Sequence, residues 1–98
     1  MIAKRKIVAF AKQNLKDTAF WYNSKQMGLG IIFLKEINEK VHYICKNPLH
    51  CQIRYGTIRI AFTKKFSFGI HYEYLPIENQ IIIYAVFHTS QNPTLWEK

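Results

Sequence analysis

Two cysteines and two histidines within ten residues are the first side chains in this sequence with the means to do chemistry. Cys45 and Cys51 are the only cysteines, and His42 and His50 lie beside them in the segment VHYICKNPLHCQ. Thiolate and imidazole groups are good zinc ligands, and residues three apart share one face of a helix. The spacing, however, contains neither a C-x-x-C knuckle nor an H-x-x-x-H pair. We therefore expect no metal and no other cofactor, and two reduced, partly buried thiols near a helix end.

Two further groups of reactive side chains are typical of ordinary surface structure. Glu36 and Glu39 lie on one side of a predicted helix, but Lys35 and Lys40 are within reach, so we expect ion pairs and no paired-carboxylate catalysis. Ser90 lies close to a histidine in the sequence, yet no acidic residue nearby would orient the imidazole. A Ser–His–Asp triad is therefore not expected.

The charge balance predicts an anionic partner. Fourteen Lys and Arg residues against six Asp and Glu give a formal net charge of +8, which attracts nucleic acid, an acidic protein segment or anionic lipid. With 98 residues, 49% of them hydrophobic, the chain fits one packed domain over 1–98. The longest apolar run, at 81–87, has the length of a strand and not of a membrane span. We expect a soluble, cytoplasmic protein that does not contact membranes.

The first half of the chain predicts a strand and two helices. Residues 5–10, RKIVAF, are typical of a short strand, and residues 11–27 have helical periodicity without Gly or Pro until Gly28 ends the helix. A second helix starts near residue 31. The apolar positions that we expect to face the core are Leu15, Ala19 and Tyr22 in the first helix and Leu34, Ile37, Val41 and Ile44 in the second.

The second helix ends at Asn47, because a residue that precedes proline is disfavoured in the helical region. The short Gly-Leu-Gly link should fold the two helices back as an antiparallel hairpin.

The second half of the chain predicts three strands, at 57–62, 66–74 and 80–87. The first two alternate apolar and polar positions, which leaves Arg59 pointing outward and His71 on the exposed side. Short links predict an antiparallel meander. With the helical hairpin on one face of this sheet, the expected fold class is α+β in the order β-α-α-β-β-β.

Several short motifs occur in a fixed order along this framework. They are WY at 21–22, GLG at 28–30, NP at 47–48, Tyr55 ahead of Arg59, FSFGIHY at 66–72 and AVFHTSQNPTLW at 85–96. Taken with the order of elements, the chain resembles the RelE/ParE superfamily of bacterial toxins from type II toxin–antitoxin systems. The resemblance covers nearly the whole chain and implies a RelE/ParE-like α+β fold.

The resemblance also implies a growth inhibitor that a cognate, co-transcribed antitoxin holds inactive by wrapping it with an extended or helical segment. The net charge of +8 predicts that this segment is acidic and apolar. The best-known branches of the superfamily differ in their targets. RelE-like members enter the ribosomal A site and cleave messenger RNA, whereas ParE-like members bind DNA gyrase and poison it.

A RelE-like nuclease takes its catalytic Arg, Lys, His and Tyr residues from the concave face of the sheet and the last strand. Where these nucleases commonly carry an arginine, in the motif resembling FGIHY, this chain has Gly69, and its polar turn at 89–92 contains no cation. A ribonuclease would have to use His88, or else His71, as the acid or base. Its phosphate-binding residues would be Arg59, Lys64 and Lys65. Each of these residues also has a simpler role, in a solvated turn, on an outward strand position or in closing the sheet.

A ParE-like toxin needs exposed aromatic or cationic anchors and no proton relay. Adjacent helical residues point about 100° apart, so one of Trp21 and Tyr22 should pack and the other border an exposed groove. Trp96 either docks onto the helical hairpin or contacts the target. The residues expected to bind the target or the antitoxin are Trp21, Tyr22, Arg54, Arg59, Lys64, Lys65, His88, Gln91 and Trp96.

The sequence therefore predicts a ParE-like toxin that binds DNA gyrase and carries out no catalysis of its own. Two alternatives stay open. One is a RelE-like, ribosome-dependent messenger RNA endonuclease, and the other is a degenerate member of the family that binds its antitoxin and is no longer toxic.

Overall fold

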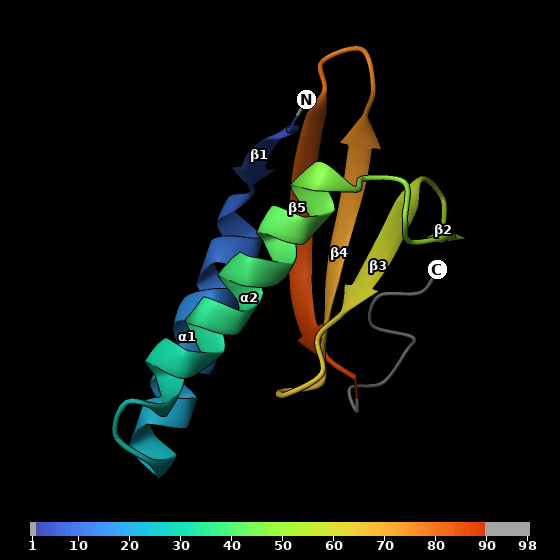
Figure 1. Cartoon of the computed structure of the whole chain (residues 1–98). Coiled ribbons are helices and arrows are strands. Elements are labelled where there is room, and N and C mark those ends of the chain that lie inside the picture. Colours follow the sequence, from blue (N-terminus) through green and yellow to red (C-terminus); the bar gives the residue numbers. More distant parts are fainter. Residues whose placement is uncertain (1, 90–98) are drawn as a thin grey trace.

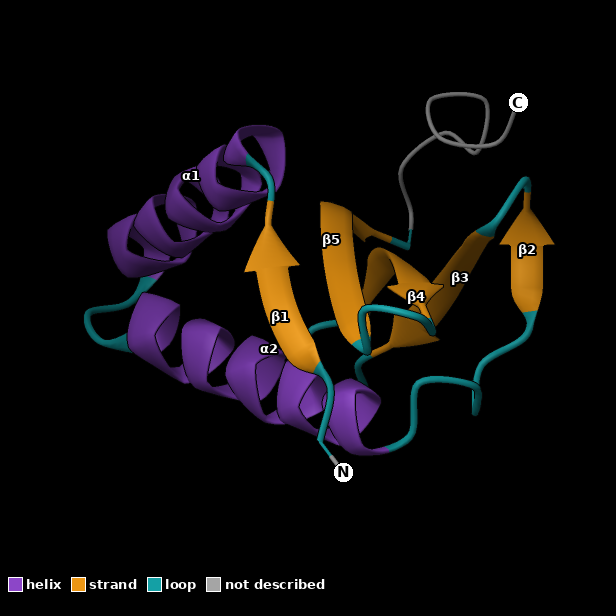
Figure 2. Cartoon of the chain, turned by 90° about the horizontal axis from the view of Figure 1, so that it is seen from above, coloured by secondary structure: helices purple, strands orange, loops and turns teal. Residues whose placement is uncertain are grey.

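A computed structural model describes residues 2–89 and shows two helices on one face of a five-stranded sheet (Figures 1 and 2). The sheet order is β1-β5-β4-β3-β2. The elements are β1 (Lys4–Ile7), α1 (Ala9–Lys25), α2 (Leu29–Lys46), β2 (Ile53–Tyr55), β3 (Ile58–Phe62), β4 (Phe68–Leu75) and β5 (Gln80–His88).

The predicted α+β class is confirmed, and the sheet adds two features that the sequence did not predict. β1 pairs with β5 in parallel, whereas the other neighbouring strands are antiparallel, so the sheet is mixed. β2 is an additional edge strand of only three residues, paired irregularly with β3. A strand this short is too brief to show an alternating pattern.

The core lies between the helices and the sheet. α2 contributes Phe33, Ile37, Val41 and Ile44, which pack against inward side chains of β4 and β5 such as Ile70, Tyr72, Ile81 and Ile83. The prediction that Leu34 belongs to this stripe is wrong, because Leu34 is 39% exposed and Phe33 takes its place. Phe33 and Leu34 both fit the helical spacing to Ile37, and their side chains differ in direction only by the 100° step between neighbouring residues.

Two glycines set the hairpin between α1 and α2. Gly28 caps α2 with a φ of 84°, a left-handed conformation that glycine adopts without strain. Gly30 lies against α1, where a Cβ would overlap the carbonyl oxygen of Ala19, and its N–H donates to Asn23 Oδ1 at 2.7 Å. The helices therefore touch closely at this end. Neither of them combines the length and hydropathy needed to cross a bilayer.

Candidate functional site

On the face of the sheet opposite the helices, side chains cover Gly69, the position where RelE-like nucleases commonly carry an arginine. Gly69 on β4 pairs with Phe62 on β3. A Cβ on Gly69 would lie 3.0 Å from Ile60 Cγ2 and 3.3 Å from Phe62 Cε1, which is tighter than ordinary contact. The guanidinium carbon of Arg54 lies 5.6 Å from the centre of the Phe62 ring, within cation–π range. Apolar side chains thus fill the space above Gly69, with one cation beside them.

His71 is buried on this same face, so the prediction that it is exposed is wrong. Its side chain is 1% exposed, and its Nδ1 lies 2.8 Å from the Tyr55 hydroxyl. The Phe87 ring packs edge-on, with its centre 5.4 Å from that of the imidazole. Burial, helped by the positive charge of Arg54, lowers the pKa of His71 to about 4. The imidazole is therefore neutral near pH 7.

The residues proposed for RNA cleavage do not form one cluster. Arg59 is half-buried, not outward as predicted, and it donates from Nη1 to the carbonyl oxygen of Cys51. Arg59 pairs with Tyr72 of β4, whereas His88 pairs with Phe68 of the same strand. Those two partners are four residues apart, about 13 Å along β4. Arg59 and His88 also lie on strands on opposite sides of β4.

The turn between β3 and β4 carries the two candidate lysines, and a carboxylate from α2 holds it in place. Lys64 and Lys65 are both exposed. Glu36 Oε2 accepts the backbone N–H of Lys65 at 2.8 Å, and its Oε1 accepts that of Phe66 at 3.2 Å. The prediction that Glu36 pairs with a neighbouring lysine is therefore wrong, since the carboxylate binds the turn.

A shallow trough runs along α2 on both sides of this Glu36 contact. Its wall on α2 consists of Ile32, Lys35, Glu36, Glu39, Lys40 and Tyr43, which recur at helical spacing on one face. Phe62, Thr63, Lys64 and Lys65 form the opposite wall. We call this surface the lysine trough. It consists of two hollows of about 280 and 420 Å³ that share Glu36 and Glu39.

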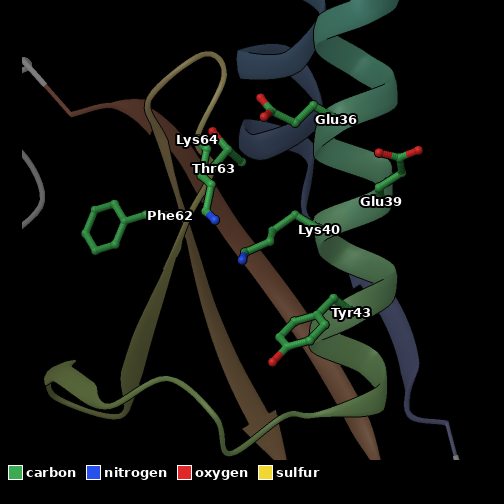
Figure 3. A pocket seen from close by; sticks show the side chains of 7 residues that line it. All are labelled: Glu36, Glu39, Lys40, Tyr43, Phe62, Thr63 and Lys64. Atoms are coloured by element: carbon green, nitrogen blue, oxygen red, sulfur yellow. The ribbon is translucent and has the colours of Figure 1, made fainter.

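Figure 3 shows the hollow at the Tyr43 end of the lysine trough. The ammonium groups of Lys40 and Lys64 project from opposite walls into the space between α2 and β3, while the Phe62 ring points away from α2. The Lys40 ammonium lies 5.1 Å from the centre of the Tyr43 ring. This end of the trough therefore offers two converging cations above an aromatic side chain.

Trp21 and Tyr22 divide as predicted, one exposed and one packed. Trp21 is 54% exposed, and the Lys25 ammonium lies 5.2 Å from the centre of its ring. Tyr22 is half-buried against Phe33 and Phe66, with ring centres 5.5 and 4.9 Å away. Trp21 is thus the member of the pair that is available to a partner.

The remaining candidates for binding are Arg54, Gln91 and Trp96. Arg54 is exposed on the edge strand β2. Gln91 and Trp96 lie outside the described residues.

The four potential zinc ligands lie in different environments. Cys45 is buried in the core, His42 and His50 are exposed, and Cys51 is half-buried. Burial raises the pKa of the Cys45 thiol, against a smaller opposing effect of the Arg5 guanidinium. Within residues 2–89, no three or more His, Cys, Asp or Glu side chains gather as a metal site would require.

Solved structures of two toxin–antitoxin systems resemble this chain over most of its length. A chain of the chromosomal ParDE system from P. aeruginosa matches with a TM-score of 0.76 and 13% identity, covering 89% of this chain and 96% of that one. The chain therefore has a RelE/ParE-like α+β fold. A chain of the RelBE2 toxin–antitoxin complex from Mycobacterium tuberculosis matches with a TM-score of 0.64 and 10% identity, covering 90% of this chain and 99% of that one. No family model and no curated protein matches the sequence.

Within this RelE/ParE fold, sequence reasoning missed the residues that shape the two surfaces described above. Tyr55 and Phe62 cover the sheet face, and Lys40 and Tyr43 line the trough. The trough did leave a signal, because its α2 wall follows a strict helical spacing from Ile32 to Tyr43. The contacts of Tyr55 and Phe62 on the sheet face left no such signal in the sequence. They depend on the register between β2, β3 and β4, which the sequence alone does not define.

Proposed function

We propose that this chain is the toxin of a type II toxin–antitoxin system, held inactive in the cytoplasm by a cognate antitoxin. Two facts support a toxin role: the fold shared with the ParDE and RelBE2 structures, and the net charge of +8, which favours an acidic inhibitor. We propose further that the toxin is ParE-like and acts by binding DNA gyrase, without chemistry of its own.

The observation that carries the ParE-like proposal is the closed sheet face above Gly69. An arginine at this position would need Ile60 and Phe62 to move, because even a Cβ is crowded there. His71 is neutral near pH 7, and Arg59 is held by the Cys51 carbonyl. Loss of one preorganised donor typically costs a nuclease on the order of a hundredfold or more in rate. Binding of a target requires no preorganised donor and no acid or base on this surface, whereas cleavage requires both.

The test is brief expression of the chain with two measurements on the same cells. Messenger RNA integrity is followed beside plasmid supercoiling and DNA breaks. We expect DNA damage with intact transcripts, and inhibition of purified gyrase by the purified chain. Trp21→Ala should weaken this inhibition, whereas Phe20→Ala, next to it and also exposed, is the matched control. Rapid cleavage of transcripts at codons, with undamaged DNA, would overturn the ParE-like assignment.

One observation favours the RelE-like endonuclease as the second candidate. The end of β5 is joined to the turn that carries Lys64 and Lys65, because the Thr89 N–H donates to the Ser67 carbonyl oxygen at 2.9 Å. His88 thus lies at the same end of the sheet as these two cations. If the chain cleaves transcripts, His88→Gln should abolish cleavage and leave antitoxin binding intact. A chain that binds its antitoxin and harms neither RNA nor DNA would be the degenerate, non-toxic member.

A further inference from the structure

The lysine trough presents more positive charge than its own carboxylates neutralise. Lys35, Lys40, Lys64 and Lys65 line it, against Glu36 and Glu39. The Glu36 carboxylate already accepts two backbone N–H groups of the turn. Within the described part of the chain, none of the four lysines forms an ion pair. Two lysines on α2 and two on the β3–β4 turn therefore line the trough, with one carboxylate among them that has no backbone partner.

The trough also has an apolar side chain at each end. Ile32 is 44% exposed and Tyr43 is 39% exposed. They are eleven helical positions apart, which corresponds to about 16 Å along α2. An extended segment of about five residues would span this distance, as would about three turns of helix. The trough thus has the pattern of a linear docking site, with apolar anchors at the ends and cations between them.

We propose that the lysine trough is a docking site for an acidic segment of the antitoxin, with two apolar side chains flanking at least two carboxylates. One apolar side chain packs on Ile32 and the other on Tyr43. The carboxylates bind between the converging lysines of α2 and the β3–β4 turn. This inference rests on the proposed function and adds to it the surface and the chemical class of the partner.

The two glutamates favour a protein segment over a nucleic acid. A phosphate backbone carries a negative charge at every nucleotide, so a strand along the trough would place phosphates beside Glu36 and Glu39. A protein segment avoids this repulsion by placing an amide or a cation opposite Glu39. The apolar ends also match Leu, Ile or Phe side chains, which a phosphate backbone does not supply.

The proposed function requires a cognate acidic antitoxin in an adjacent reading frame. The experiment measures the affinity of the full chain for this acidic protein, by isothermal titration calorimetry at low and physiological salt. The test variant is Lys40→Gln with Lys64→Gln. The control is Lys12→Gln with Lys16→Gln, which removes the same charge from two exposed positions on α1 that are outside the trough. We expect Kd to rise about tenfold in the test variant with a shallower salt dependence, and to change less than about twofold in the control. Tyr43→Ala should also weaken binding, with little change in the salt dependence.

The possible outcomes separate this inference from the proposed function. If the wild-type chain binds the acidic protein, and the test and control variants bind it equally well, the trough is not the docking site and the toxin assignment stands. Amide chemical-shift changes confined to surfaces away from α2 and the β3–β4 turn would lead to the same conclusion. If the trough variant instead loses binding to a single-stranded RNA and keeps the acidic protein, the trough binds nucleic acid. If the wild-type chain binds no acidic partner, the proposed function fails and this inference with it.

Discussion

The contact between Glu36 and the β3–β4 turn allows a quantitative test of how the helical layer holds the sheet. The carboxylate accepts two backbone N–H groups, from Lys65 at 2.8 Å and from Phe66 at 3.2 Å. A hydrogen bond to a charged group contributes about 1.5–3 kcal/mol to stability. Glu36 is half-buried and its second bond is long, so we take the low end for the first bond and less for the second. Glu36→Ala should therefore cost about 2 kcal/mol.

The matched control is Glu39→Ala, one turn along the same helix. Glu39 is exposed, so its removal should change stability by no more than about 0.5 kcal/mol. Both variants replace a helical Glu by Ala, so helix propensity and net charge change equally. Glu36→Gln should fall between wild type and Glu36→Ala, because one oxygen remains an acceptor while the new amide faces an N–H donor.

Thermal unfolding followed by circular dichroism measures the difference. For a domain of 98 residues, 2 kcal/mol corresponds to a melting temperature lower by about 8–16 °C. Equal melting temperatures for Glu36→Ala and Glu39→Ala would show that the carboxylate does not hold the turn. The β3 side of the lysine trough would then lack the support described here.

Three further predictions concern the core and the sheet face. The pKa of His71 is about 4, below the ordinary 6.5. The contribution of this side chain to the free energy of unfolding is therefore fully present above pH 6.5 and decreases by up to roughly 3 kcal/mol as the pH falls towards 4. Urea unfolding should show this loss in wild type and in His42→Gln but not in His71→Gln. Gly30→Ala should destabilise by about 1–3 kcal/mol, whereas at an uncrowded helical site alanine would stabilise. Tyr22→Ala should cost about 3 kcal/mol and Trp21→Ala less than about 1, and equal losses would contradict the packing.

The periodic parts of this fold were predictable from sequence, because periodicity reports which side of an element is buried. Asn47 before Pro48 fixed the end of α2, and the alternation of β4 placed Phe68, Ile70 and Tyr72 inside. The same reasoning wrongly predicted that His71 is exposed. Alternation shows that its side chain points away from the core under the helices, but it does not show whether other side chains cover it on the opposite face. Tyr55 and Phe87, which cover it, come from strands far apart in the sequence.

The candidate site was harder to predict for the same reason. Lys64 and Lys65 were expected in a turn, and the structure places them there. The position of Lys64 opposite Lys40 depends on how α2 crosses the sheet, which no single segment encodes. Glu36 looked like half of a local ion pair, and its true partners are backbone groups about thirty residues away.

The parallel pairing of β1 with β5 affects when the protein can fold during its synthesis. The Lys4 N–H donates to the Asn79 carbonyl oxygen, and the Val8 N–H donates to that of Ile83. β1 therefore cannot complete its pairing until β5 has been synthesised. Contacts of such long range form late and slow folding. In a nascent chain the sheet therefore closes only after β5 has left the ribosome. The proposed antitoxin, if already present in the cell, would meet a chain whose sheet is still open and could bind it before folding is complete.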